Sequence, residues 1–339
     1  MKTKQKTPIP FKVREHGFSK SRTANWNCDI NVIYDLMFFI FERENIRIQK
    51  DELKQSAPWT KDPILGKHRF TQVDRRLDAG TVYLLENVIH PLSRLLKNAS
   101  KERLNDLRKS MIEAITIYRL FNRIPTWEEI MNHRGSGLEH ILFREWLNEK
   151  FRKEITEKFE NMNQAGFPIF TGAHLVYAGP SEKHGRGGRS MVRYYWEIII
   201  PGVLSRVNEI LTVANKTNSV EKVFDEFKSC QGLGPFISFQ IVSDLVYTPL
   251  LISAKDRNTF AAYGPGSLRF LKLAFPKSSP RDNRELSLFL LGQVNEKMTP
   301  IGRELDLSDI EHCFCETAKY IALRDGKSRA RVYPFGVEK

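Results

Sequence analysis

The sequence predicts a mainly α-helical fold, with room for one small β element. Long segments place apolar residues at helical spacing, most clearly residues 101–123. Only residues 167–179 and 191–202 have a β-like composition, and either is also compatible with a helix. A Gly-Leu-Gly-Pro turn between two helical segments predicts a helix-hairpin-helix element at about 219–247.

The first part of the chain predicts a flexible arm followed by a single helical domain. Residues 1–25 are basic, and Pro8 and Pro10 prevent a regular helix there. The domain then extends over residues 26–339. The apolar run INVIYDLMFFIFEREN after Asp29 predicts a buried helix, and the prolines and glycine of SAPWTKDPILG predict a loop after it.

Helices are expected to continue to the end of the chain. Two helical segments lie around Gly80 and Pro91, and the amphipathic helix 101–123 ends before Pro125. Another helical run closes on Gly166. The last third of the chain alternates short helices with glycine and proline turns.

The chain is strongly basic, and this limits its partners. Its 339 residues include 53 Lys and Arg against 40 Asp and Glu, a net charge of +13. Residues 1–24, 183–193 and 324–331 are basic clusters, and the second contains Arg186 and Arg189. Three separate clusters suggest a positively lined face, which gains DNA or RNA affinity by neutralising phosphates. A merely soluble basic surface is the alternative.

Several classes of protein are excluded. No stretch approaches the roughly 18 apolar residues of a membrane span. The basic N-terminus is not followed by the apolar segment of a secretory signal. Four cysteines are too few for a disulfide framework, and the spacing of Cys313 and Cys315 fits neither a zinc knuckle nor a redox pair. We therefore expect no secreted, membrane-spanning or zinc-finger protein, and no metal site.

The hairpin carries the clearest local signal. Gly232 and Gly234 permit positive φ angles and close backbone approach, and Pro235 suits the first position of a helix. The N–H groups at that helix start offer a site for a DNA phosphate. An ordinary helix–helix turn with a glycine C-cap is the alternative. A second turn, with Gly264 and Gly266, precedes LRFLKLAF and offers another anion site.

Polar side chains follow one face of the helix after the hairpin. Phe236, Gln240 and Asp244 recur every four residues, while Ile237, Ile241 and Leu245 form an apolar face. Gln240 and Asp244, one turn apart beside a phosphate-binding hairpin, are suited to meet a base edge or a reacting group. A solvated polar face is the alternative.

Short motifs spread along nearly the whole chain carry a resemblance to a known family. The chain resembles the alpha-glutamyl/putrescinyl thymidine pyrophosphorylases, or amino acid:DNA transferases, of phage thymine hypermodification. This family is related to the helical domain of 5-hydroxymethyluracil DNA kinases and to helix-hairpin-helix DNA glycosylases. The matching segments are FFIFEREN, PWTKDPIL, RFTQVDRRLD, IYRLFNRIPTW, FTGAH, GLGPFISFQIVSDLVY, GPGSLR and EHCFCETAKY.

The sequence departs from the family pattern at two places. Gln72 and Val246 stand where the family usually or often has Asn, which leaves the amine donor open. In addition, no P-loop pattern G-x-x-x-x-G-K-[ST] occurs, so the resemblance to kinases does not extend to ATP phosphoryl transfer.

The resemblance implies a reaction on double-stranded DNA that contains modified thymine. An amino acid or a polyamine such as putrescine displaces pyrophosphate from 5-(pyrophosphoryloxymethyl)uracil, after a 5-hydroxymethyluracil DNA kinase has acted. The product protects phage DNA from host restriction, which implies a host cytoplasmic location. The target nucleotide must flip or the groove must open. No cofactor is required by sequence, and Mg²⁺ held through the pyrophosphate leaves little trace.

The same resemblance implies roles for individual residues. Asp244, with Gln240 as partner, is the first candidate for general base or amine orienter, and Asp62, Asp74 and Asp78 are the alternatives. The i, i+3 residues Glu316 and Lys319 are further catalytic candidates, with a helix-stabilising pair as the alternative. The substrate-binding and pyrophosphate-binding candidates, for which surface salt bridges or core packing are the alternatives, are Trp59, Thr60, Asp62, Arg69, Asp74, Arg75, Asp78, Tyr118, Arg119 and Asn122. DNA-backbone contacts are expected from Gly232, Gly234, Gly264, Gly266, Arg186 and Arg189.

Two other functions remain open. A helix-hairpin-helix glycosylase usually has a catalytic Asp about twenty residues beyond the hairpin glycines, and Asp256 lies near that place. A non-catalytic DNA-binding module is the second alternative. The acidic residues of the N-terminal motifs argue against a pure binder, which needs fewer acids near phosphates.

Overall fold

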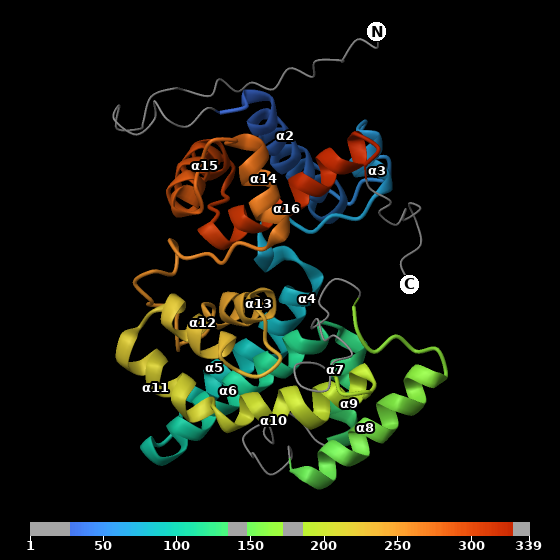
Figure 1. Ribbon diagram of the computed structural model, residues 1–339, viewed down its shortest axis with the longest axis vertical. Coiled ribbons are helices and arrows are strands. Elements are labelled where there is room, and N and C mark those ends of the chain that lie inside the picture. Colours follow the sequence, from blue (N-terminus) through green and yellow to red (C-terminus); the bar gives the residue numbers. More distant parts are fainter. Residues whose placement is uncertain (1–27, 135–147, 172–185, 328–339) are drawn as a thin grey trace. The chain divides into compact units, whose positions relative to one another are not determined.

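The computed structural model describes residues 28–134, 148–171 and 186–327, and every regular element in these ranges is a helix (Figure 1). The prediction of a mainly α-helical fold is confirmed. Residues 191–202 are helical, because Ser190 caps a run of α9 (Met191–Tyr194), the π-helical η6 (Tyr195–Ile199) and α10 (Ile200–Ser205). The small β element that the sequence allowed is absent from the described ranges. The predicted basic arm lies outside them.

The chain forms two compact units. Unit 1 combines the residues up to Arg75 with those from Tyr263 onward, and unit 2 is Arg76–Ala262. The single helical domain expected over residues 26–339 stays a prediction, and each unit is described by itself.

Unit 1 is built around its last helix, α16 (Leu307–Arg324), which packs against α14 (Pro265–Ala274) and α2 (Ile30–Arg47). Its other elements are η1 (Ile48–Glu52), α3 (Pro63–Lys67), η7 (Pro280–Asp282), α15 (Asn283–Met298) and η8 (Thr299–Ile301).

Close approach of α14 to α16 depends on one glycine. A Cβ atom at Gly266 would collide with Sγ of Cys315. One turn further along, the rings of Phe270 and Phe314 stack with their centroids 4.7 Å apart. The glycine therefore allows the two helices to bring these buried rings together.

Unit 2 is built around α6 (Lys101–Phe121), which contacts α13 (Pro235–Leu245), α11 (Val207–Thr217) and α5 (His90–Lys97). The remaining elements are η2 (Arg75–Leu77), which leads in from unit 1, α4 (Ala79–Leu84), η3 (Leu85–Ile89), α7 (Ile124–Arg134), α8 (Glu149–Gln164) and α12 (Val220–Lys228), together with α9, η6 and α10.

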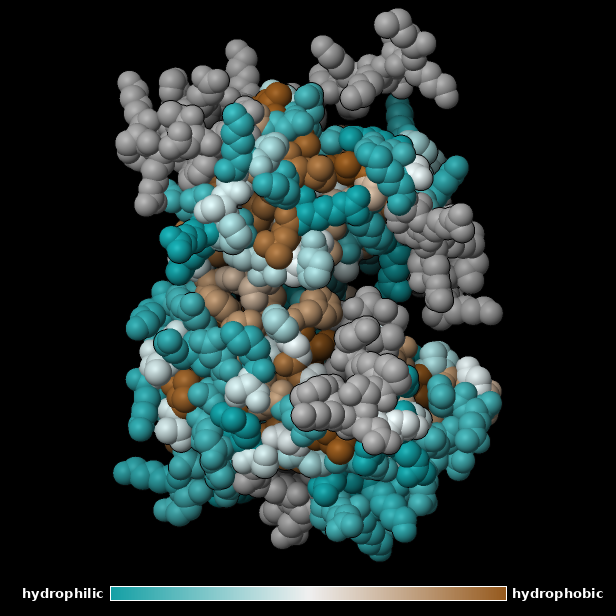
Figure 2. All heavy atoms as spheres, in the orientation of Figure 1, coloured by the Kyte–Doolittle hydropathy of each residue, from teal (hydrophilic) through white to brown (hydrophobic). Residues whose placement is uncertain are grey.

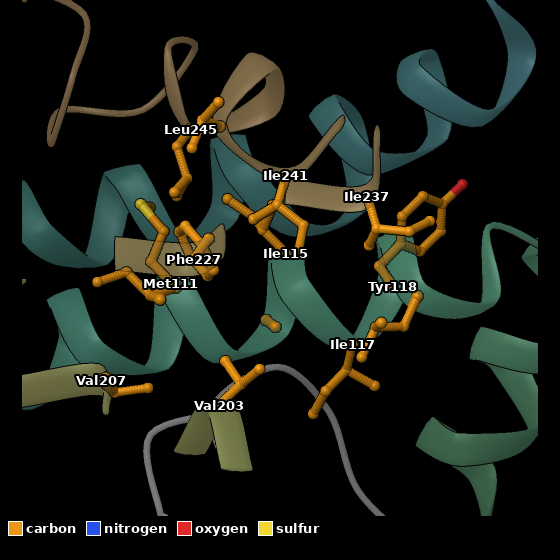
Figure 3. Close-up of a cluster of buried hydrophobic side chains, with 14 of the residues drawn as sticks. Met111, Ile115, Ile117, Tyr118, Val203, Val207, Phe227, Ile237, Ile241 and Leu245 are labelled. Carbon is orange, nitrogen blue, oxygen red and sulfur yellow. The ribbon is translucent and has the colours of Figure 1, made fainter. Parts of the chain in front are cut away.

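The core of unit 2 forms where α13 crosses α6 (Figure 3). Ile237, Ile241 and Leu245 of α13 are buried and lie toward Met111 and Ile115 of α6. The apolar face that the sequence predicted for this helix is thus confirmed. Replacing one such side chain with alanine typically lowers the free energy of unfolding by about 2–5 kcal/mol.

Candidate functional site

A buried arginine joins the two central helices of unit 2. Nε of Arg119, on α6, donates to Oδ2 of Asp244, on α13, at 2.6 Å, and its Nη2 donates to Oδ1 at 2.8 Å. Nη1 donates to Oδ1 of Asn122 at 2.6 Å, and Nη2 also reaches Oγ1 of Thr81 at 3.4 Å. We call Thr81, Arg119, Asn122 and Asp244 the Arg119 cluster.

The Arg119 cluster limits what its members can do. The Asp244 side chain is completely buried, and both of its oxygens accept from the same guanidinium. The Arg119 side chain is only 4% exposed, and each of its three nitrogens already donates within the cluster. This geometry holds α6 and α13 in register. The roles predicted for these residues, general base and pyrophosphate binder, stay predictions.

The neighbours of this cluster are buried or half-buried. The Tyr118 hydroxyl donates to the Gly80 carbonyl at 2.7 Å, and burial raises the pKa of this phenol. Its ring stacks on Tyr83. Gln240 is buried on α13, and Asp78 precedes α4 as its half-buried N-cap residue. Tyr118 therefore has the core position that the sequence left open.

A turn that contains Gly232 and Gly234 joins α12 to α13, and its assignment as a helix-hairpin-helix element stays a prediction. Gly232 has a φ of 81°, and a Cβ atom there would lie 2.8 Å from Cγ1 of Ile199, so only glycine fits. Gly234 is the N-cap of α13 and has open space at the Cβ position. Contact of these glycines with a DNA backbone stays a prediction.

The aspartate expected of a glycosylase caps a helix. Asp256 accepts from Oγ of Ser219 at 2.6 Å and from the N–H groups of Val220 and Glu221 at the start of α12. Burial by itself acts to raise the pKa of Asp256. The hydrogen bonds to its carboxylate act in the opposite direction and outweigh burial, so the net pKa is lowered. Asp256 thus has a sufficient structural role.

In unit 1, residues far apart in sequence meet along one side of α16. Tyr320 donates to Oδ2 of Asp62 at 2.8 Å, while the other oxygen of Asp62 caps α3. Nζ of Lys319 donates to the Arg69 carbonyl at 2.6 Å. His312 hydrogen-bonds to the Thr71 hydroxyl, and burial lowers the pKa of His312 to about 4. We call Asp62, the segment 69–75 and six residues of α16 the α16 cluster; the α16 residues are Asp309, Glu311, His312, Glu316, Lys319 and Tyr320.

The first turn of α16 carries a buried carboxylate of the same cluster. Oδ1 of Asp309 accepts from the Arg75 backbone N–H at 2.9 Å. Burial raises the pKa of Asp309 well above its ordinary range, and the nearby charges of Asp306 and Asp74 raise it further. The side chains of Asp74 and Arg75 are themselves buried. The substrate-binding roles predicted for both stay predictions.

Glu311 is a residue of this cluster that sequence reasoning missed. Its Oε1 accepts from Oγ of Ser267 at 2.6 Å and from the Gly264 N–H at 3.3 Å, at the N-terminus of α14. Burial raises the pKa of Glu311. The predicted anion site at this turn therefore holds a carboxylate from the chain itself. No local sequence pattern signals this contact, because Ser267 and Glu311 lie 44 residues apart.

Glu316 and Lys319 are the partly exposed members of the α16 cluster. Nζ of Lys319 lies 3.2 Å from Oε2 of Glu316 and 4.4 Å from the centre of the Phe70 ring. The side chains are 14% and 34% exposed, and the neighbouring Arg69 is exposed. The cluster thus places two cations and one carboxylate within reach of solvent.

The remaining predicted residues lie apart from this group or at its edge. Nε1 of Trp59 donates to the Gln55 carbonyl, and Thr60 donates to Glu42. Arg189 pairs with Glu197 at 3.0 Å. The half-buried Arg186 lies three residues earlier, and its backbone carbonyl accepts from the backbone N–H of Arg189.

One hollow of about 470 Å³ occurs in unit 2 between α8 and the α9–η6–α10 run. Its lining mixes acidic and basic side chains around Trp196 and includes none of the predicted site residues. Within the described ranges, no three His, Cys, Asp or Glu side chains are grouped as a metal site would require. In the same ranges, no helix is both long and apolar enough to span a membrane.

The chain belongs to the family described as the helical domain of 5-hmdU DNA kinase, whose model matches residues 30–329. Among curated proteins it is similar to the 5-hmdU DNA kinase of Bacillus phage SP10, with 24% identity over 303 residues. The match covers 85% of this chain and 45% of that kinase, so the chain spans about half the length of its relative. No solved structure matches. The expected relation to these helical domains is confirmed.

Proposed function

We propose that the protein is a DNA base-modifying transferase that replaces pyrophosphate on 5-(pyrophosphoryloxymethyl)uracil with an amino acid or a polyamine. One observation carries the proposal. Short segments spread in order along nearly the whole chain, among them FFIFEREN, PWTKDPIL, GLGPFISFQIVSDLVY and EHCFCETAKY, resemble the amino acid:DNA transferases. The chain also belongs to the helical-domain family of 5-hmdU DNA kinase, to which those transferases are related, and this supports a reaction on the same modified base.

The step requires little chemistry beyond charge and proton handling. The neutral amine attacks the 5-methylene carbon, a C–N bond forms, and the C–O bond to pyrophosphate breaks. The amine proton passes to a carboxylate, and the bond electrons leave with pyrophosphate. Cations must stabilise the charge that develops on the leaving group, and a general base must take the proton.

The α16 cluster offers a group for each of these tasks. The exposed Arg69 and the partly exposed Lys319 belong to the same cluster, since the Lys319 ammonium lies 2.6 Å from the Arg69 backbone carbonyl. Glu316 lies beside them at 3.2 Å. We assign pyrophosphate binding to the two cations and proton acceptance to Glu316. Asp244, which has no solvent exposure, supports the fold in this scheme.

The relative, a 5-hmdU DNA kinase of a phage, supports a biological setting for the proposal. In this scheme such a kinase acts before the proposed step, the substrate is double-stranded DNA, and a net charge of +13 suits that substrate. The modified thymine would protect phage DNA from restriction in the host cytoplasm. Mg²⁺ carried by pyrophosphate belongs to the substrate in this scheme.

The test uses duplex DNA with pyrophosphorylated 5-hydroxymethyluracil and a mixture of amino acids and polyamines. Mass spectrometry of the digested nucleosides should show a new nucleoside and identify the amine. Free base with abasic sites would indicate a glycosylase, and unchanged DNA that still binds would indicate a binding module. Either result contradicts the proposal.

Variants of the α16 cluster locate the chemistry. Glu316→Gln should slow turnover by about 10²-fold or more, as loss of a general base typically does, without loss of folding. The matched control is Asp225→Asn, because Asp225 and Lys228 form an exposed i, i+3 pair at 3.0 Å on α12. An equal rate for Glu316→Gln and the control would contradict the assignment of Glu316.

A further inference from the structure

Helix α14 has one face buried in unit 1 and one face exposed. Ser267, Phe270, Leu271 and Ala274 are buried against the unit. The intervening positions, Pro265, Leu268, Arg269, Lys272 and Leu273, are exposed. Because these positions recur every three or four residues, they form one continuous stripe along the helix.

The stripe and the segment after it carry positive charge alone. From Tyr263 to Arg281 the sequence has no Asp or Glu, and its four cations, Arg269, Lys272, Lys277 and Arg281, are all exposed. Lys272 donates to the Pro276 carbonyl, and none of the four makes an ion pair within the described residues.

Several other basic side chains of the two units are paired with acids. Arg47 and Arg303 pair with acids in unit 1, and Arg193 and Arg206 do so in unit 2. Four exposed cations that make no ion pair among the described residues leave a local excess of positive charge. Such an excess favours a polyanion as the partner.

Two leucines lie among these cations. Leu268 is 41% exposed and Leu273 is 38% exposed, and both are large apolar side chains at the surface. Figure 2 shows apolar spheres bordered by hydrophilic ones over this helix. Two half-exposed leucines offer little area for insertion into a lipid surface, but they suit contact with the sugars of a nucleic acid between its phosphates.

We propose that this face, Leu268, Arg269, Lys272, Leu273, Lys277 and Arg281, is a docking surface for the phosphate backbone of duplex DNA. We call it the α14 face. The inference rests on the proposed function, in which DNA is the substrate. It adds the surface of the protein that binds this DNA. The cations bind phosphates without reading sequence, so the α14 face contributes affinity and leaves base selection to other residues.

The salt dependence of binding measures this contribution. Each neutralised phosphate contributes about 0.9 to the slope of log affinity against log salt concentration. Replacing all four cations with glutamine should lower the slope by about 3.6 if each contacts one phosphate. Between 50 and 200 mM salt, wild-type affinity should then fall about 150-fold more than that of the variant.

The experiment titrates unmodified duplex DNA with the full chain and with the variant R269Q/K272Q/K277Q/R281Q over this salt range. Its matched control replaces four exposed lysines of unit 2, namely Lys97, Lys101, Lys216 and Lys222. The control should keep the wild-type slope. Circular dichroism and thermal unfolding establish that both variants fold. An unchanged slope in the α14 variant, or an equal loss in the control, would overturn the inference.

A second variant separates apolar contact from charge. Leu268→Ala with Leu273→Ala should weaken DNA binding at every salt concentration and leave the slope unchanged. If DNA binding survives both variants while vesicles rich in phosphatidylserine bind wild type and not the α14 variant, the face belongs to a lipid surface and the inference is wrong.

The DNA used carries no activated base, so this test is independent of the transferase reaction. A changed slope with no turnover on pyrophosphorylated DNA would refute the proposed function and support the α14 face. Turnover with an unchanged slope would support the proposed function and refute the α14 face.

Discussion

The buried pair of Arg119 and Asp244 predicts a large loss of stability when its negative charge is removed. In Asp244→Asn the side chain keeps its shape, but the guanidinium of Arg119, only 4% exposed, loses its counter-charge and one of two acceptors at 2.6 and 2.8 Å. Breaking a buried pair by removing one partner typically destabilises by about 3–5 kcal/mol. We expect that loss here.

The assay is urea unfolding followed by circular dichroism. The control, Asp225→Asn, breaks an exposed pair with Lys228 in the same unit and should change stability by less than about 1 kcal/mol. The double variant Arg119→Met with Asp244→Leu should regain much of the loss, because it leaves no buried charge.

One result would refute this reasoning. If Asp244→Asn unfolds at the same urea concentration as wild type but does not turn over pyrophosphorylated DNA, Asp244 acts in the reaction rather than in the fold. The general-base role that the sequence suggested for it would then stand.

Three further predictions concern single side chains. Gly266→Ala should destabilise by about 1–3 kcal/mol, as overpacking does, and Cys315→Ala in the same chain should relieve part of the loss. Asp256→Ala should lower stability by about 1–2 kcal/mol through loss of the α12 cap, with no change in base chemistry, whereas a glycosylase would lose activity. The pKa of His312 is lowered from 6.5 to about 4, so its contribution to stability is complete above pH 6.5 and is lost as the pH falls toward 4. Denaturation of His312→Gln across this range should show a shallower loss, and an unchanged profile would contradict the burial argument.

Local patterns predicted the helices well. The apolar face of Ile237, Ile241 and Leu245 follows from helical spacing alone, and so does the turn at Gly232. The environment of Asp244 does not follow from helical spacing. Its partner Arg119 lies 125 positions earlier, and no local pattern reports a pairing over that distance.

The α16 cluster illustrates the same limit. Glu316 and Lys319 were predicted as catalytic candidates, with a helix-stabilising pair as the alternative that their spacing allows, but the contact of Lys319 with the Arg69 carbonyl spans 250 residues. The glycine turn at Gly264 was predicted to bind an anion. Its N–H donates to Glu311, an acid that sequence reasoning had not singled out. A helix N-terminus indicates that an anion is favoured there but not which one.

The fate of one oxygen atom tests the central claim most directly. DNA with oxygen-18 between the 5-methylene carbon and the pyrophosphate is incubated with the protein and an amine, and both products are analysed by mass spectrometry. Displacement at carbon predicts that the label leaves with pyrophosphate and that each released pyrophosphate matches one amine-bearing nucleoside. Label retained on a 5-hydroxymethyl group would mean cleavage at phosphorus and would contradict a transferase.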